Sequence, residues 1–182
     1  SKFFNIKALT FLGGMGRNAE ELATATKGTY VESAPFGSMY PKERLQLLDQ
    51  ENLASALIYP SIGLAWECEV EDYELSMAYC RAYNRWVVDF CADSNDRLVP
   101  IAHISLPDGQ EAAKELERSV KAGCKGAFVA PYTITNKPHS HPDYDPFWAK
   151  AQELDVPISI HPMAEPPAKR VYQRFKDMKG AD

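Results

Sequence analysis

The feature that most constrains the fold is a repeated alternation of short apolar segments with longer amphipathic ones. Four apolar segments have the composition of buried strands, at residues 54–61, 97–105, 126–131 and 156–162. The last three begin roughly thirty residues apart, the length of a strand followed by a crossover helix. Near-continuous apolar strands at this spacing are typical of a parallel sheet covered on both faces. The sequence therefore predicts the α/β class.

The segments between the strands carry the end signals of helices. Pro41 opens a first helix of about two turns. Asp108 and Glu111 form a capping-box pattern before another helix, which Gly123 ends. A last helix opens at Asp145, which proline follows.

The longest predicted helix covers about residues 69–93. It carries an apolar stripe that we expect to face the core, formed by Tyr73, Met77, Cys80, Val87 and Cys91 and widened by Tyr83, Trp86 and Phe90. Asn84 lies within that stripe, so its amide needs a hydrogen-bond partner there.

The two ends of the chain do not follow the alternation. We expect residues 1–40 to form an irregular or inserted segment, 41–165 the strand and helix repeats, and 166–182 a charged tail. The tail ends without a cap, so we expect further chain to belong after it. The glycines of FLGGMGRN do not match G-x-G-x-x-G, which favours a flexible loop over a phosphate-binding one.

Composition limits the class of partner. A net charge of −5 argues against nucleic acid and anionic membranes, which favour basic surfaces. The sequence contains no apolar run of the roughly 18 residues that a membrane span needs, and no cleavage site of the A-x-A kind, so we read the start as ordinary chain. The four cysteines form no C-x-x-C pair, which predicts buried thiols and a cytoplasmic protein.

Polar and aromatic residues follow the predicted strands where ligands bind in parallel α/β sheets, at the carboxyl ends. His161 ends the segment ISIHP, and an imidazole there must be paired, ligating or catalytic. The alternative is a core histidine that bonds a backbone carbonyl. His103 also ends a strand, and either reaches substrate or has a hydrogen-bonded structural role.

Other candidates lie in the loops beyond the strands. His139 and His141 form an H-x-H between prolines, so they bind a metal, line a pocket mouth or simply belong to a loop. Three aromatic residues are candidate pocket walls or ordinary packing residues: Tyr59, Tyr132 and Trp66.

Four segments together resemble a known family. They are RLQLLDQENLASALIYPSIGL, YNRWVVDFCADSNDRLVPIAHISLPD, ELERSVKAGCKGAFV and HPDYDPFWAKAQELDVPISIHP. Their order and spacing, over residues 44–162, resemble the amidohydrolase-related family that includes aminocarboxymuconate-semialdehyde decarboxylase and the resorcylate decarboxylases. One departure is Asn52, where that family often has glycine; we expect it to affect only a local turn.

The resemblance implies a (β/α)₈ barrel with a divalent metal, usually zinc, at the carboxyl ends of its strands. In that family an H-x-H or E-x-H pair on the first strand, a histidine ending the fifth and an aspartate ending the eighth hold the metal. His161 matches the fifth-strand ligand. Such a barrel needs about 250 residues, so we expect strands two to five here, a partial barrel, with the other three ligands absent. The chain alone is then expected to be inactive unless another chain completes the site.

Two functional hypotheses follow. The first is a metal-dependent hydrolase or non-oxidative decarboxylase that acts on a small carboxylated or cyclic substrate. The second is a non-catalytic half-barrel module that has lost its metal centre and, because its sheet edges are open, forms a homo-oligomer. A nucleotide-binding α/β fold has the right class but lacks the glycine fingerprint.

Overall fold

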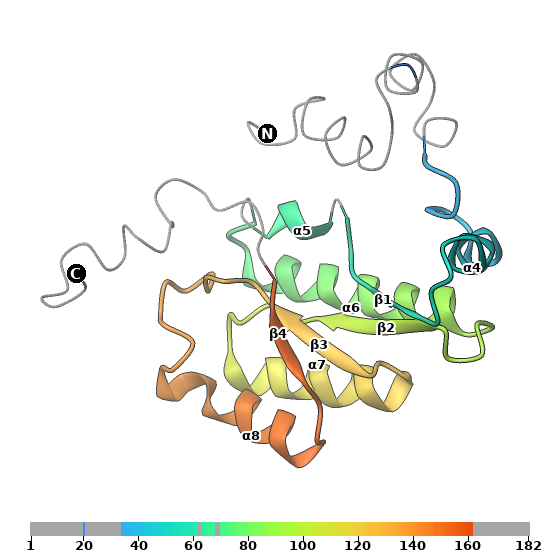
Figure 1. Cartoon of the computed structure of the whole chain (residues 1–182). Coiled ribbons are helices and arrows are strands. Elements are labelled where there is room, and N and C mark those ends of the chain that lie inside the picture. The colour runs from blue at the N-terminus through green and yellow to red at the C-terminus, as the bar shows by residue number, and fades with distance from the viewer. Residues whose placement is uncertain (1–19, 21–33, 62, 68–69, 162–182) are drawn as a thin grey trace, which may run out of the picture.

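The computed structural model describes residues 20, 34–61, 63–67 and 70–161. The elements within these residues follow in the order α4 (Pro41–Gln50), β1 (Ala56–Ile58), α5 (Gly63–Trp66), α6 (Tyr73–Cys91), β2 (Leu98–His103), α7 (Gly109–Ala122), β3 (Gly126–Val129), the 3₁₀ turn η1 (Pro142–Tyr144), α8 (Asp145–Glu153) and β4 (Ile158–Ile160) (Figure 1). None of the helices in the described part of the chain combines the length and apolar character that a membrane span requires.

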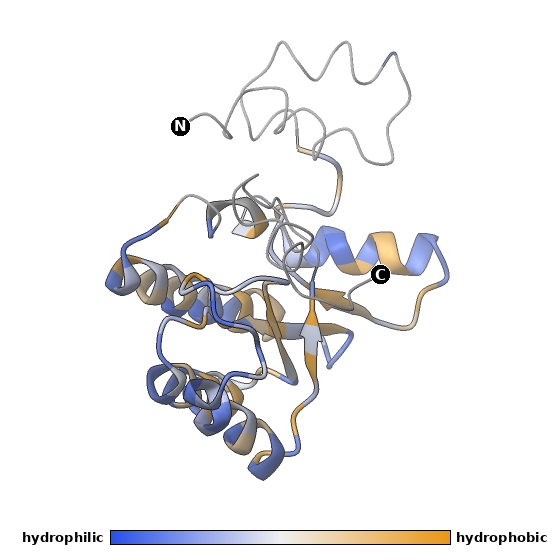
Figure 2. Cartoon of the chain, turned by 90° about the vertical axis from the view of Figure 1, so that its left-hand side faces the viewer, coloured by the Kyte–Doolittle hydropathy of each residue, from blue (hydrophilic) through white to orange (hydrophobic). Residues whose placement is uncertain are grey.

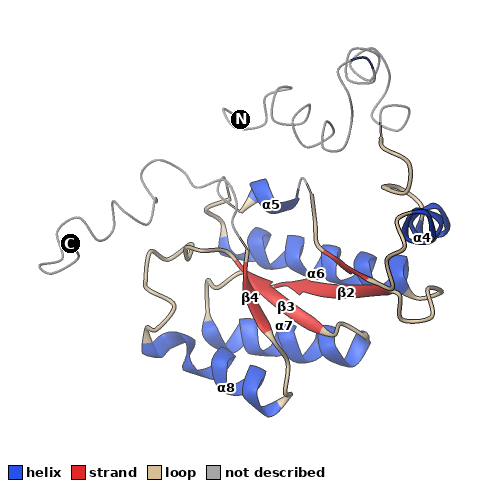
Figure 3. Ribbon diagram, in the orientation of Figure 1, coloured by secondary structure: helices blue, strands red, loops and turns tan. Residues whose placement is uncertain are grey.

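The four strands form one sheet in the order β1-β2-β3-β4, with every neighbouring pair parallel. Each connection between consecutive strands contains a long helix: α6, α7 and α8 in turn. These three helices lie along one side of the sheet (Figure 3). The predicted α/β class is confirmed: the chain forms a half barrel of parallel βα units.

The strand register divides the side chains between two faces. His103 lies beside Phe128, and Phe128 lies beside Ser159, so these three side chains share the interior face of the half barrel. Side chains of the alternate positions, such as Leu98 and Val129, join the core between sheet and helices. In Figure 2 the strands are mostly apolar, and the helices carry hydrophilic residues on their outer sides.

Local capping explains where the helices begin and end. The Asp72 side chain accepts a hydrogen bond from the backbone N–H of Leu75 (3.0 Å), so α6 begins at Tyr73, a few residues later than predicted. The Asp108 carboxylate accepts from the N–H groups of two residues of α7, and Gly123 ends that helix with φ of 128°, both as predicted. Asn52 has φ of 53°, a conformation that suits glycine and that asparagine tolerates.

The apolar stripe of α6 was predicted only in part. Met77, Cys80 and Val87 are buried as expected, but Tyr73 and Trp86 are each 49% exposed. Tyr73 is the first residue of the helix. Trp86 lies about 120° around the helix from Cys80, off the buried face. The buried face also includes two polar side chains, Ser76, which was not predicted, and Asn84, which was.

Asn84 connects three elements, which confirms that it needs a partner. Its side-chain N–H₂ donates to the His103 carbonyl (3.0 Å) and to the Glu115 carboxylate (2.7 Å). Its side-chain carbonyl accepts from the backbone N–H of His103 (2.7 Å). One amide thereby fixes α6 and α7 against the carboxyl end of β2.

Glu115 is the charged member of this network and is only 4% exposed. Burial raises the pKa of its carboxyl group, but hydrogen bonds from Arg118 and Asn84 and the nearby Arg118 charge outweigh burial and lower the pKa below its ordinary value. Arg118 donates to it from two nitrogens, at 2.8 and 2.5 Å, and Ser119 adds a further hydrogen bond (3.1 Å). The carboxylate is therefore ionised and fully partnered inside the protein.

We expect Asn84→Ala to lower the free energy of unfolding by about 2–4 kcal/mol, because it removes partners from the buried Glu115 and from the His103 backbone. Urea unfolding followed by circular dichroism measures this loss. Asp89→Ala, on the exposed side of the same helix, is the control and should change stability by no more than about 0.5 kcal/mol. Equal stability of the two variants would contradict the structural role of Asn84.

We expect the stabilisation from the Glu115 carboxylate to disappear in acid. Because the pKa is depressed in the folded state, this stabilisation is complete above the unfolded pKa and is lost as the pH falls through the folded pKa. Wild type should exceed Glu115→Gln in unfolding free energy by a constant amount at neutral pH, and the difference should shrink below about pH 4.3. A difference that grows on acidification would contradict the ionised state.

Candidate active site

His161 lies on the interior face of the half barrel, just beyond β4. Its backbone N–H donates to the Val129 carbonyl (3.1 Å), which continues the ladder between β3 and β4. Its ring centroid is 5.1 Å from that of Tyr59 and 5.9 Å from that of Phe128. The imidazole is therefore among the strand ends and not beneath the helices.

Tyr59 follows β1 and reaches across the interior face. Its ring centroid is 5.5 Å from that of Phe128, and its hydroxyl is 3.3 Å from the hydroxyl of Ser159 on β4. The sheet order separates β1 from β4 by two strands. The contact with Ser159 therefore shows how concave the half barrel is at this end.

His103 and Glu67 form a buried pair below these rings. The imidazole Nε2 is 2.7 Å from a Glu67 carboxylate oxygen, and both side chains are almost completely excluded from solvent. The His103 ring is stacked on Phe128, with a centroid distance of 4.4 Å and an angle of 19° between the planes. Because Glu67 directly follows α5, the pair anchors this segment over the carboxyl ends of the strands.

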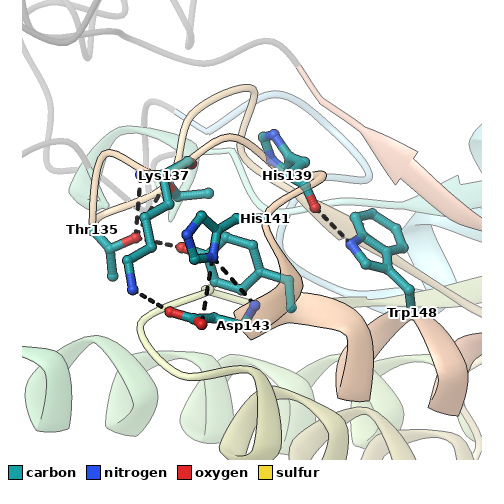
Figure 4. Close-up of polar contacts among 8 residues, drawn as sticks. Thr135, Lys137, His139, His141, Asp143 and Trp148 are labelled. Atoms are coloured by element: carbon teal, nitrogen blue, oxygen red, sulfur yellow. Dashed lines mark hydrogen bonds and ion pairs between the residues drawn. The ribbon is translucent and has the colours of Figure 1, made fainter.

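His139 and His141, the two histidines of the predicted H-x-H, lie in the segment that joins β3 to α8. The His139 ring nitrogen Nε2 is 2.9 Å from the Ala130 carbonyl, and the His139 carbonyl accepts from the Trp148 indole (2.8 Å). His141 instead accepts from the backbone N–H of Asp143 (3.2 Å) and caps η1. Figure 4 shows the two rings separated, with His141 beside Asp143.

Two further aromatic candidates are Tyr132 and Trp66. Tyr132 is 1% exposed, so its side chain is packed inside the described fold. Trp66 falls within α5 and not in a loop, and its side chain lies outside the described residues. The predicted irregular segment at the start, the glycine-rich stretch and the charged tail also lie outside the described residues, apart from residues 20 and 34–40, so they stay predictions.

The described cysteines are unsuited to nucleophilic chemistry. Burial raises the pKa of Cys91 and of Cys124 to about 11, and it raises that of Cys80 well above its usual range. All three are free, buried thiols, as predicted. They remain protonated at neutral pH.

We call Tyr59, Glu67, His103, Phe128 and His161 the mouth cluster. It combines four stacked or tilted rings with one buried carboxylate, at the carboxyl ends of the strands, where parallel α/β enzymes bind ligands. Glu67 was missed by sequence reasoning because it lies outside any periodic pattern. Only the path of the chain through α5 brings it to His103.

The described residues do not by themselves form a metal site. Within them, no three histidine, cysteine, aspartate or glutamate side chains are grouped to hold an ion. His161 offers a single imidazole at the strand ends. Catalytic zinc usually has three protein ligands.

A match to a protein-family model shows which family the chain belongs to. The model described as Amidohydrolase matches residues 63–179, which include α5, the whole segment from α6 to β4 and His161. The chain belongs to the amidohydrolase family.

A curated amidohydrolase relative is similar in sequence over part of its length. Gamma-resorcylate decarboxylase from Rhodococcus jostii is 30% identical over 128 residues, which cover 65% of this chain and 38% of the relative. The chain spans about two fifths of the length of the curated relatives that it matches.

Solved structures show that this amidohydrolase has the fold of a partial TIM barrel. The 2,6-dihydroxybenzoate decarboxylase from Rhizobium superposes with a TM-score of 0.64 at 23% identity, over 90% of this chain and 50% of that one. A dihydroxybenzoic acid decarboxylase from Polaromonas, solved with bound manganese and 2-nitroresorcinol, gives 0.65 at 21% identity, over 94% of this chain and 50% of that one. The predicted family and fold are thereby confirmed.

We expect Glu67→Leu to lower the free energy of unfolding by about 2–4 kcal/mol, because it removes the buried carboxylate that His103 contacts. Adding His103→Phe to this variant should recover part of the loss, since two apolar side chains replace a buried polar pair and keep a ring on Phe128. Denaturant unfolding of both single variants and the double variant measures the coupling. Strict additivity of the two losses would show that the pair contributes nothing beyond its separate side chains.

Proposed function

We propose that this chain supplies the central βα units of a metal-dependent, non-oxidative decarboxylase of a small aromatic carboxylate. The observation that carries this proposal is the mouth cluster: the His161 imidazole lies beside the Tyr59 and Phe128 rings on the interior face. The names of the relatives, which are decarboxylases of resorcylate and dihydroxybenzoate, support this substrate class.

The cluster suits a flat aromatic ligand on physical grounds. Aromatic rings prefer tilted or offset contacts at centroid distances of about 4.5–7 Å. Tyr59, Phe128 and His161 already pack against one another in this range. The hydroxyls of Tyr59 and Ser159 lie in the same region and supply hydrogen bonds for a phenolic substituent.

A non-oxidative decarboxylation includes no redox step. It requires that the substrate be held in position and that the negative charge on it be stabilised. The bond between the ring carbon and the carboxylate breaks, carbon dioxide leaves, and the electron pair that remains on the ring takes up a proton. Ring-stacking residues orient the substrate, and exclusion of water strengthens every polar contact made to its carboxylate.

We assign His161 as the ligand that the described residues contribute to a divalent metal. The family resemblance implied zinc, and a solved relative contains manganese, so both ions deserve testing. When bound, the metal would stabilise negative charge on the substrate. Because no three potential ligands are grouped among the described residues, the other ligands must come from outside them or from another chain.

Tyr59 and His103 remain our candidates for the substrate pocket. His103 would contribute indirectly, because its ring stacks on Phe128 and so helps to position that ring in the pocket. The loop residues Tyr132 and His139 complete the proposed pocket region at the end of β3. We leave His141, the other pocket candidate from the sequence, outside this region, since its ring caps η1.

A non-catalytic half-barrel module is the second candidate. The observation that favours it is the absence of a three-ligand group among the described side chains. This hypothesis predicts that neither metal nor substrate binds.

We expect the protein to release carbon dioxide from 2,6-dihydroxybenzoate in the presence of manganese, and to lose this activity with a chelator. His161→Ala should lower kcat/KM at least about 100-fold, because it removes a metal ligand. His141→Ala is the matched control: it removes an imidazole from the same end of the sheet and should change kcat/KM by less than about threefold, since its ring caps η1.

Inductively coupled plasma mass spectrometry of the purified protein separates the two candidate functions. Bound manganese or zinc that His161→Ala loses and His141→Ala retains supports the enzyme. No activity and no metal in wild type, with an intact circular dichroism spectrum, supports the module. Full activity in His161→Ala would contradict the assignment of this ligand.

A further inference from the structure

Two hydroxyl groups from opposite edges of the sheet meet on the interior face of the half barrel. The Tyr59 hydroxyl is 3.3 Å from the Ser159 hydroxyl, and the Ser159 hydroxyl is 3.4 Å from the backbone carbonyl of Ala127. Tyr59 and Ser159 are each only partly buried, whereas Ala127 is buried. We call Tyr59 and Ser159 the hydroxyl pair. It lies beside Phe128, whose ring contacts Tyr59 and which is in register with Ser159.

These contacts fix the direction of both hydroxyl protons. A backbone carbonyl can only accept a hydrogen bond, so the Ser159 hydroxyl donates its single proton to Ala127. The Ser159 oxygen therefore meets Tyr59 as an acceptor, and the Tyr59 hydroxyl donates its own proton to Ser159. Both protons of the hydroxyl pair are thus used within the protein.

The hydroxyl pair consequently offers lone pairs, and no proton, to a ligand. Lone pairs accept a hydrogen bond from a phenolic O–H group, but an ether oxygen or an ionised carboxylate brings no proton to donate. A carboxylate held against them would lose its contacts with water and gain no hydrogen bond in return. Sites built to hydrogen-bond a substrate hydroxyl discriminate strongly against analogues that lack it.

We propose that Tyr59 and Ser159 are specificity-determining residues, which accept a hydrogen bond from a ring hydroxyl of the substrate and exclude its carboxylate from their end of the site. The inference rests on the proposed function for the aromatic carboxylate class of the substrate. It adds the orientation: the hydroxyl-bearing edge of the ring lies at the hydroxyl pair, and the carboxylate points away from it.

The surroundings of the hydroxyl pair suit a ring bound in this orientation. His161 lies two residues beyond Ser159, on the same interior face, and its ring centroid is 5.1 Å from that of Tyr59. A ligand whose hydroxyl reaches Tyr59 is therefore brought beside aromatic side chains that prefer tilted or offset ring contacts.

A purely structural role for the hydroxyl pair makes a different prediction. The contact joins the end of β1 to β4, so it also holds the two edges of the half barrel together. Such a link affects stability but is indifferent to whether a ligand carries hydroxyl or ether groups. Ligand preference therefore separates the two roles.

Ligand-observed NMR titration of the full chain with resorcinol and with 1,3-dimethoxybenzene tests the proposal. The two probes share the ring and the positions of both oxygens, but only resorcinol has hydroxyl protons to donate. Wild type should bind resorcinol at least about tenfold more tightly, because the ether oxygens leave the lone pairs of the hydroxyl pair without a donor.

Ser159→Ala removes the acceptor that holds the Tyr59 proton. The released Tyr59 hydroxyl can then donate to an ether oxygen, so the preference for resorcinol should fall below about threefold. Any contact of the probes with a metal is common to both proteins, so the change in preference reports the hydroxyl pair. Ser55→Ala makes the same change at an exposed serine before β1, and should keep the wild-type preference.

Tyr59→Phe is the second variant. It keeps an aromatic ring beside Phe128 but removes the oxygen that accepts from the ligand. Resorcinol should therefore bind this variant at least about tenfold more weakly than wild type, while the affinity for 1,3-dimethoxybenzene should change by less than about threefold. Circular dichroism spectra equal to that of wild type would show that both variants fold.

Neither probe has a carboxyl group, so the preference is measured whether or not the protein releases carbon dioxide. A wild type that binds both probes equally, or binds neither, overturns the inference, as does an undiminished preference in Ser159→Ala. A preference for resorcinol without decarboxylation supports the role of the hydroxyl pair and counts against the catalytic proposal alone. Decarboxylation without the preference has the opposite meaning.

Discussion

Parallel pairing in a fixed register is the constraint on which the rest of this structure depends. Because side chains alternate along each strand, one register sends Leu98 and Val129 into the core beneath the helices and turns His103 and Phe128 to the concave interior. A shift of one residue would exchange the two sets. The apolar core and the mouth cluster are thus two consequences of the same hydrogen-bond ladder, and neither can be altered without the other.

A small number of buried polar groups fix the carboxyl ends of the strands within this frame. Asn84 bonds both backbone groups of His103, and Glu67 contacts the ring of the same histidine. Buried polar groups stabilise only when they are satisfied, so these contacts hold β2, α5 and α6 in one arrangement. Phe128 stacks on His103 and also packs against the rings of Tyr59 and His161, so the fixed position of His103 helps to position all three rings.

Membership of the amidohydrolase family agrees with this geometry at the level of the fold. The matched segment contains the helical layer and three of the four strands, and the solved relatives superpose over most of this chain. The described half barrel presents an aromatic, imidazole-bearing surface at the end where such barrels bind ligands. Within the described residues, no three potential ligands are grouped to hold a metal ion.

The sequence by itself determined the class, the order of strands and helices, and several of the helix ends. These features depend on residues that are close together in the sequence. Examples are the apolar periodicity, the Asp108 cap and the glycine at position 123. It also placed His161 at a strand end and required a partner for Asn84. It could not name that partner, because Glu115 and the His103 backbone are distant in the chain.

Only the tertiary structure decided which apolar residues are buried and which polar residues meet. Periodicity gave α6 one broad stripe that included Trp86, but the packing of the folded chain leaves Trp86 49% exposed. The path of the chain through α5 brought Glu67 to His103, and the curvature of the sheet brought Tyr59 to Ser159. Such contacts arise from packing between distant segments, and no pattern within a short stretch of sequence contains that information.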